Sequence, residues 1–216
     1  MVLIRPIDVL YVLLIPLLFV SSISGFKERI RFFVQQKWQV LIIITTVVLC
    51  LTPQFLYFKF ISGHWVFYTY SNESFFFSNP RWLESMFSFR NGWLIYSPLM
   101  LLSLVGIVVL KRKRKELFLP TLVIFVIYTF VITSWWCWWY VGFGNRAFIN
   151  LYPLLCFPLA AIITSILEKK WWWKLLFSSV FIMGIGLSVF QTLQYYNGLI
   201  HWGYMTKKAY LYTFLK

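Results

Sequence analysis

Acidic residues are scarce in this chain. Asp and Glu together number only six among 216 residues, and charged residues of both signs make up 12% of the sequence. Apolar residues make up 61%, and the mean hydropathy is +0.76, which is higher than water-soluble folds of this length usually have. Lipid is therefore the expected solvent for most of the chain, and the composition predicts an integral membrane protein.

Cysteine and histidine are rare as well. Cys50, Cys137 and Cys156 are odd in number, lack CxxC spacing and lie in or beside apolar stretches, so they are interpreted as packing residues. His64 and His201 are isolated in the sequence, so neither a metal site nor a cofactor is predicted. A phosphate-binding glycine loop is also missing, which excludes an ATP-driven transporter within this chain.

Six apolar runs have roughly the 20 residues that a helix needs to cross a bilayer core of about 30 Å. They are Ile7–Ser24, Trp38–Phe58, Trp93–Leu110, Leu117–Ser134, Phe148–Leu167 and Leu175–Leu193. The sequence therefore predicts an all-α fold, a polytopic bundle of about six transmembrane helices that forms a single transmembrane domain over residues 1–216.

Basic residues give the chain a net charge of +14, but they occur in short clusters between apolar runs. This arrangement suits membrane orientation better than a nucleic-acid-binding face. The clusters follow the first, third and fifth runs and contain Lys27, Arg29, Arg31 and Lys37, then Lys111–Lys115, then Lys169, Lys170 and Lys174. Because positive loops stay inside, these clusters are predicted to be cytoplasmic. Both termini, the aromatic loop of residues 59–92 and the Trp135–Arg146 connection are then predicted to be outside.

The Trp135–Arg146 connection mixes flat apolar side chains with polar donors. Two interpretations are open: a sugar ring or an isoprenoid phosphate binds here, or the turn only returns the chain into the membrane with a snorkelling arginine. The candidates for donor binding in this turn are Trp138, Trp139, Gly142, Gly144, Asn145 and Arg146.

The predicted outer loop, residues 59–92, contains many aromatic residues and few charges. Such a loop would be poorly solvated, so we expect it to lie on the membrane surface or over a cavity between helices. Arg90 lies at its end, on the same predicted side as Arg146. A membrane arginine that faces a bundle needs an anionic partner, which Glu73, Glu84 or a ligand phosphate would supply.

Two segments carry a resemblance to a known family. They are NESFFFSNPRWLESMFSFRNGWLIYSPLMLLSLVGI, from Asn72, and SWWCWWYVGFGNRAFINLYPLLCFPLA, from Ser134. Over roughly residues 53–161 the chain resembles the C-terminal half of multipass bacterial glycosyltransferases related to protein O-mannosyltransferases, which have the C-type glycosyltransferase fold. The resemblance implies transfer of a sugar from a polyprenyl-phosphate donor to an acceptor on the outer face of the bacterial cytoplasmic membrane. It also implies that residues near the donor are Arg90, Asn91, Gly92, Gly142, Gly144, Asn145 and Arg146.

The chain departs from this family in its acidic residues. Family members are usually more than twice as long and have a catalytic carboxylate in their first outer loop, whereas Asp8 is the only acid here before the first basic cluster. Transfer to a hydroxyl requires a base. Among the acids predicted outside, we interpret Asp8 as a helix-terminal acid and Glu84 as a surface charge, which leaves Glu73 as the candidate catalytic residue. The missing motif predicts that the chain is the C-terminal part of a longer enzyme and is inactive without the N-terminal portion.

The alternative hypothesis is a non-catalytic multipass protein, such as a transporter or an assembly component. A transporter of charged solutes normally places ionisable residues within its membrane segments, and the predicted segments carry almost none. The sequence therefore favours the glycosyltransferase, with a polyprenyl-phosphate sugar and membrane lipid as its partners.

Overall fold

The protein is an all-α membrane helix bundle, as the sequence predicts. The computed structural model describes residues 5–67, 73–140 and 142–214, and every regular element in these residues is a helix. Residues 68–72 of the predicted outer loop, Tyr70 and Asn72 among them, lie outside the described residues.

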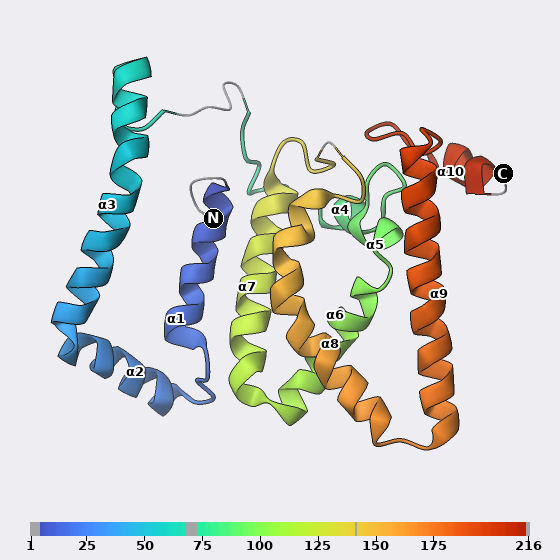
Figure 1. Ribbon diagram of the computed structural model, residues 1–216, viewed down its shortest axis with the longest axis horizontal. Coiled ribbons are helices and arrows are strands. Elements are labelled where there is room, and N and C mark those ends of the chain that lie inside the picture. The colour runs from blue at the N-terminus through green and yellow to red at the C-terminus, as the bar shows by residue number, and fades with distance from the viewer. Residues whose placement is uncertain (1–4, 68–72, 141, 215–216) are drawn as a thin grey trace.

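Four helical segments are long and apolar enough to cross a membrane (Figure 1). Two of them are single helices in the first and last thirds of the chain, α3 (Lys37–Ser62) and α9 (Trp171–Tyr196). The other two are α7 (Lys115–Ser134) and a segment made of η2 (Arg146–Leu151) followed by α8 (Tyr152–Leu167). These four confirm the second, fourth, fifth and sixth predicted runs.

The first predicted run is shorter than expected. It forms η1 (Pro6–Leu13) and α1 (Leu14–Leu17), after which Leu18 is extended and Phe19 has a positive φ of 61°. The helix cannot continue through this backbone conformation, so Pro6–Leu17 is too short to cross about 30 Å of hydrocarbon. The predicted boundary at Ser24 is therefore wrong.

A separate amphipathic helix, α2 (Ile23–Gln35), follows this break. The Ser22 side chain caps it by accepting a hydrogen bond of 3.1 Å from the Gly25 backbone amide. The basic residues Lys27, Arg29 and Arg31 therefore lie on a helix that joins the lower ends of α1 and α3, rather than in an irregular loop (Figure 1).

The third predicted run, Trp93–Leu110, is also divided. It contains the short helix α5 (Trp93–Tyr96), an interruption at Ser97–Leu99, and α6 (Met100–Lys113). Pro98 disfavours helical backbone at Ser97, which adopts φ −133° and ψ 61°. Only the α6 part enters the bundle as a continuous helix.

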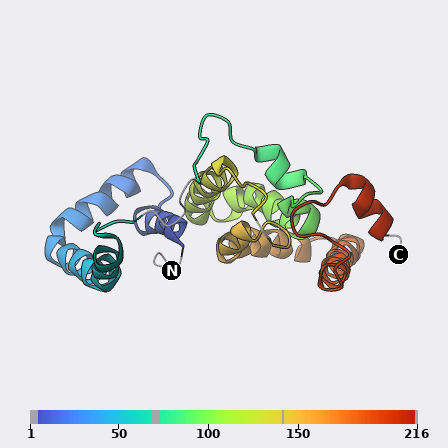
Figure 2. The same ribbon diagram turned by 90° about the horizontal axis from the view of Figure 1, so that it is seen from above.

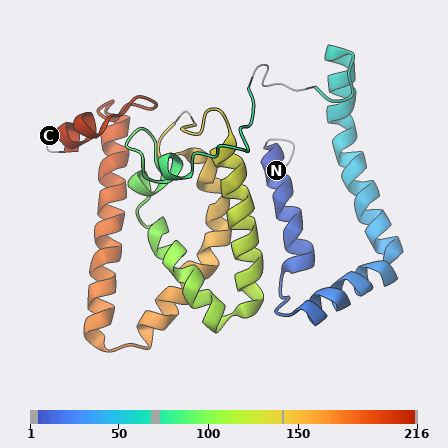
Figure 3. The same ribbon diagram turned by 180° about the vertical axis from the view of Figure 1, so that it is seen from behind.

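Alternation of the long helices gathers the basic loops at one end of the molecule. The turn between α6 and α7, the turn between α8 and α9, and α2 all lie at this basic end (Figures 1 and 3). The opposite end, called here the aromatic end, carries the Trp135–Arg146 turn, α4 (Trp82–Phe87) and the C-terminal helix α10 (Lys207–Phe214).

The centre of the bundle is formed by α6, α7 and α8. Helix α6 packs most extensively against α8, and an added Cβ on Gly106 would lie 2.1 Å from the Pro158 carbonyl oxygen. Only glycine permits this approach. Nearer the aromatic end, the buried rings of Trp93 and Phe148 stack with centroids 4.6 Å apart. This packing fixes α5 and η2 beneath the aromatic turn.

Candidate functional site: the aromatic turn

The turn between α7 and η2 is fastened to the rest of the protein by Asn91. Its side-chain nitrogen donates to the backbone carbonyls of Trp139, Tyr140 and Gly142 at 2.7, 2.8 and 3.0 Å. Its side-chain oxygen accepts a 3.1 Å hydrogen bond from the backbone amide of Asn145. Asn91 is only 2% exposed, so these bonds use the whole amide to shape the turn.

Asn145 completes the turn from the other side. It adopts left-handed backbone geometry with φ 48°, and its side-chain nitrogen donates to the Trp138 carbonyl at 3.0 Å. Asparagine tolerates this conformation better than most residues. The neighbouring Gly142 and Gly144 have φ values of 131° and 64°, which side chains with a Cβ rarely adopt. The glycine and asparagine residues of this turn therefore shape the backbone.

Gly92 is required for close packing as well. A Cβ at this position would lie 2.5 Å from the backbone nitrogen and oxygen of Ser88. The Gly92 amide also donates to the Ser88 carbonyl at 2.7 Å, which folds the chain tightly between α4 and α5. This turn places Arg90 and Asn91 directly against the aromatic turn.

The guanidinium of Arg90 lies between two aromatic rings. Its central carbon is 3.6 Å from the ring centroid of Trp139 and 5.3 Å from that of Tyr204. The Nε atom donates to the Gly203 carbonyl at 2.7 Å. Arg90 thus joins the aromatic turn to the segment after α9 through cation–π contacts and one hydrogen bond.

Arg146 is exposed and stacks on the turn itself. Its guanidinium carbon lies 4.7 Å from the ring centroid of Tyr140. In the described part of the chain, neither Arg90 nor Arg146 forms an ion pair, whereas Glu84 pairs with Arg81 at 3.2 Å. Glu84 is therefore not the anionic partner that the two arginines were expected to need.

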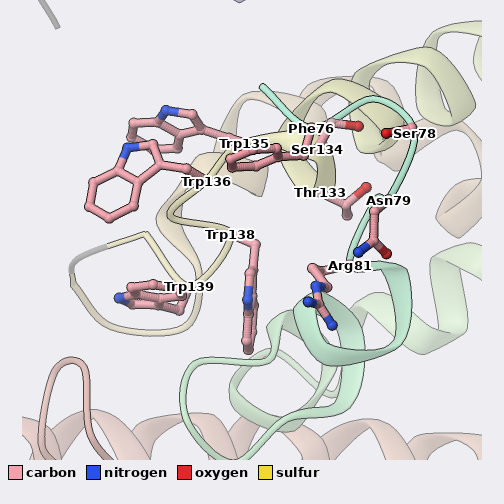
Figure 4. A pocket seen from close by; sticks show the side chains of 10 residues that line it. All are labelled: Phe76, Ser78, Asn79, Arg81, Thr133, Ser134, Trp135, Trp136, Trp138 and Trp139. Carbon is pink, nitrogen blue, oxygen red and sulfur yellow. The ribbon is translucent and has the colours of Figure 1, made fainter. Parts of the chain in front are cut away.

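A pocket of about 530 Å³ opens on the outer surface of this turn. In Figure 4, Trp138 stands between Trp139 and Arg81, with Asn79 beside Arg81. The lining comes from two parts of the chain, the segment before α4 and the end of α7 with its turn. The lining residues are Phe76, Ser78, Asn79, Arg81, Thr133, Ser134, Trp135, Trp136, Trp138 and Trp139.

Backbone pairing holds these two parts together. The Phe76 amide donates to the Ser134 carbonyl at 2.6 Å, and the Arg81 amide donates to the Thr133 carbonyl at 2.9 Å. Beyond the first of these bonds, the Trp136 backbone amide donates to the Ser74 carbonyl at 3.0 Å. The pocket therefore has walls of flat aromatic rings and a rim that carries an arginine, an asparagine and several hydroxyl groups.

Comparisons with protein-family models, with curated proteins and with solved structures find no match for this chain.

Glu73 lies beside the turn but does not line the pocket. Its carboxylate acts on the thiol of Cys137, a residue that is buried in the turn. Burial raises the pKa of the Cys137 thiol above its ordinary value, the Glu73 carboxylate raises it further, and Arg90 lowers it. A carboxylate and a guanidinium thus act on the same buried thiol from different parts of the chain.

The structure separates the predicted site residues into two groups. Trp138 and Trp139 line the pocket, and Arg90 contacts the ring of Trp139. Asn91, Gly92, Gly142, Gly144 and Asn145 instead build the turn beneath it. Arg81 is a pocket residue that the sequence interpretation did not select, although its place in the aromatic loop was a usable signal.

A second polar cluster surrounds Asp8, which is 4% exposed. Its carboxylate accepts hydrogen bonds from Tyr128 Oη at 3.2 Å and from Asn150 Nδ2 at 2.6 Å. Arg5 donates to Asn150 Oδ1 at 3.0 Å, and the Tyr11 hydroxyl donates to the Asn150 carbonyl. Asp8 is in the first turn of η1, as expected, but it is buried and joins that segment to α7 and η2.

Proposed function

We propose that the aromatic end of this protein is the donor-binding face of a membrane glycosyltransferase, and that the donor is a sugar linked to polyprenyl phosphate. The observation that carries the proposal is the pocket lined by Trp135, Trp136, Trp138 and Trp139 with Arg81 at its rim. Aromatic faces stack on the apolar faces of sugar rings, while amides, hydroxyls and guanidinium groups bind sugar hydroxyls and phosphate.

Arginines of the aromatic end support an anionic ligand. Arg90 uses its Nε atom to bind Gly203, and Arg146 has no ion-pair partner among the described residues. A guanidinium that is stacked on an aromatic ring keeps its hydrogen-bonding edge available to a phosphate. We assign Arg146 to the phosphate and Arg90 to the support of Trp139.

Glu73 is the proposed general base. In the transfer step, the acceptor hydroxyl oxygen bonds to the anomeric carbon while the bond from that carbon to the phosphate oxygen breaks. The polyprenyl phosphate leaves with the electron pair of that bond, and the proton of the hydroxyl passes to the Glu73 carboxylate. Glu73 precedes Ser74, whose backbone carbonyl accepts a hydrogen bond from the Trp136 amide. This bond holds the chain at Glu73 beside the edge of the turn, which supports the role of its carboxylate.

The proposed location is the bacterial cytoplasmic membrane, with the basic end in the cytoplasm and the pocket outside. The clustering of the basic turns at one end supports this orientation, because positive loops are retained on the cytoplasmic side. A pocket at the opposite end would then meet a lipid-linked donor at the outer surface of the membrane.

Binding to the full chain in lipid nanodiscs tests the proposal without depending on turnover. Undecaprenyl-phosphate hexose, undecaprenyl phosphate and undecaprenol are compared by native mass spectrometry. We expect affinity to fall in that order, because the sugar adds stacking and the phosphate adds charged hydrogen bonds. Equal binding of undecaprenol and the phosphorylated lipids would refute the phosphate-binding role.

Variants locate the binding to the pocket. Trp138→Leu removes a wall of the pocket and is expected to lower affinity for the hexose-linked lipid more than for undecaprenyl phosphate. Trp172→Leu is the matched control, because Trp172 is an exposed tryptophan at the opposite, basic end. Arg146→Lys should weaken both phosphorylated ligands by about tenfold, which is what a lost charged hydrogen bond typically costs.

The alternative is a non-catalytic multipass membrane protein, and the buried Asp8 is the observation that favours it. Buried ionisable groups in membrane proteins are often coupled to ion or proton movement. Asp8 does not line the aromatic pocket, however, and its carboxylate is occupied by Tyr128 and Asn150. Ion-dependent solute uptake that is abolished by Asp8→Asn, with no lipid binding at the pocket, would establish the alternative.

A further inference from the structure

Helix α3 stands apart from the rest of the bundle. None of its apolar membrane window is buried within the chain, and α2 is the element that joins it to the other helices. Seen from above, α3 lies toward one edge of the molecule, and α9 and α10 lie toward the opposite edge (Figure 2). A helix with this position presents its whole surface to lipid or to another transmembrane helix.

One face of α3 carries a pattern that suits packing against another helix. Residues on this face follow one another at alternating intervals of four and three, which is the spacing of left-handed helix pairs. They are Gln39, Ile43, Thr46, Cys50, Pro53 and Tyr57. Thr46 and Cys50 are small, so a second backbone could approach closely at the middle of the helix.

Gln54 lies beside this face within the hydrocarbon region. It is about 12 Å from the end of the helix at Ser62, on the basis of 1.5 Å per residue. The nearby Thr46 and Thr52 hydroxyls donate to carbonyls of their own helix at 2.8 Å, but Gln54 has no hydrogen-bond partner among the described residues. A polar amide in lipid without a partner is unfavourable.

Pro53 leaves a second polar group without its usual partner. It has no backbone N–H, so the Leu49 carbonyl loses the donor that a residue four positions later normally provides. The Leu49 carbonyl and the Gln54 amide are five residues, about 1.4 turns, apart on the same helix. A helix that brings another amide to the depth of Gln54 would satisfy the Gln54 side chain.

We propose that α3 pairs with α3 of a second copy of this chain in the membrane, and that Gln54 forms the hydrogen bonds between them. Two copies have the same orientation in the membrane, so a two-fold axis along the membrane normal brings their Gln54 side chains to the same depth. An amide both donates and accepts, which makes Gln54 complementary to itself. The polar pairing favours a second copy over lipid or an apolar helix.

Cys50 reports directly on this arrangement, because it lies on the proposed contact face and is exposed. A chain with Cys137→Ser and Cys156→Ser keeps Cys50 as its only cysteine. Copper phenanthroline in native membranes is expected to convert it to a disulfide-linked dimer. The matched control adds Cys50→Ala and Val48→Cys, which moves the thiol to the opposite face of α3, where Val48 is also exposed, and is expected to give little dimer.

Gln54 is tested in the same background by fluorescence energy transfer between labelled copies in bilayers, at several ratios of protein to lipid. Gln54→Leu should weaken self-association by about 3- to 30-fold, the range found for polar side chains between membrane helices. Gln54→Asn should retain most of the association because it keeps the amide. Leucine is compatible with lipid, so the Gln54→Leu monomer is expected to remain helical. Circular dichroism checks this, and weaker energy transfer from a helical monomer then reports a loss of association.

Three outcomes would overturn the proposal. They are equal cross-linking from positions 48 and 50, cross-linking of Cys50 to a chain of different mass, and unchanged association in the Gln54→Leu variant. Cross-linking and energy transfer both report contact between copies of α3, and neither depends on ligand binding at the aromatic pocket. Failure of the dimer therefore leaves the proposed donor-binding role untouched, and failure of donor binding leaves the dimer untouched.

Discussion

The side-chain oxygen of Asn91 accepts a hydrogen bond from the backbone amide of Asn145, a residue 54 positions later in the chain. With the three bonds that the Asn91 nitrogen donates, this contact holds the aromatic turn in the shape that forms the pocket. The amide thus shapes the turn beside which the resemblance places the donor.

Asn91→Asp is expected to destabilise the protein. The carboxylate would face three carbonyl oxygens with no donor of its own, and an unsatisfied buried polar group costs about 1–3 kcal/mol, or more when it is charged. Thermal unfolding in detergent measures the effect, and Asn79→Asp on the exposed rim is the matched control. Similar unfolding temperatures for the two variants would contradict the role of Asn91.

Gly106→Ala is expected to disrupt the contact between α6 and α8. Its Cβ would lie 2.1 Å from the Pro158 carbonyl oxygen, which is backbone and cannot rotate away. Overpacking of this kind typically costs about 1–3 kcal/mol. Gly186→Ala in α9 is the control, because open space surrounds that position and alanine favours a helix. We expect the first variant alone to unfold at a lower temperature.

Tyr128→Phe is expected to weaken the attachment of the N-terminal segment. It removes the hydroxyl that donates to Asp8, and a hydrogen bond to a charged group contributes about 1.5–3 kcal/mol. A double-mutant cycle with Asp8→Asn measures the coupling through thermal unfolding. Additive effects of the two substitutions would show that the contact contributes nothing beyond the individual side chains.

Cysteine labelling tests the orientation of the helices. In a chain without its native cysteines, probes at Arg114 and Lys170 should react from the cytoplasm, and probes at Asn79 and Lys208 should react from outside. The reason is that positive charge on short loops opposes translocation. Labelling of position 114 from the outside would reverse the assignment.

The reactivity of Cys137 tests the placement of Glu73 and Arg90. Because burial and Glu73 raise the pKa of this thiol, its alkylation should require a higher pH than that of an ordinary exposed cysteine. Glu73→Gln should shift the rate profile to lower pH, and Arg90→Gln should shift it to higher pH. The rates are measured with iodoacetamide after Cys50 and Cys156 are replaced, and shifts of the same sign would contradict the arrangement.

The sequence by itself determined the long helices and the grouping of basic loops. Hydropathy over about 20 residues is a local property, so the four long helical segments could be read from continuous apolar runs. The break after Leu17 was less visible, because Leu18 and Phe19 are as apolar as the residues before them and only their backbone angles end the helix.

Only the tertiary structure decided which residues form the site. In the structure, Asn91 shapes the turn and Arg81 lines the pocket. Asp8 is buried beside Asn150, 142 positions away in the chain. Each role depends on contacts between distant segments, which residue type and local spacing do not specify. The physical reason is that a polar side chain takes its role from the partners that packing brings to it, and in a membrane protein those partners replace the water that is missing.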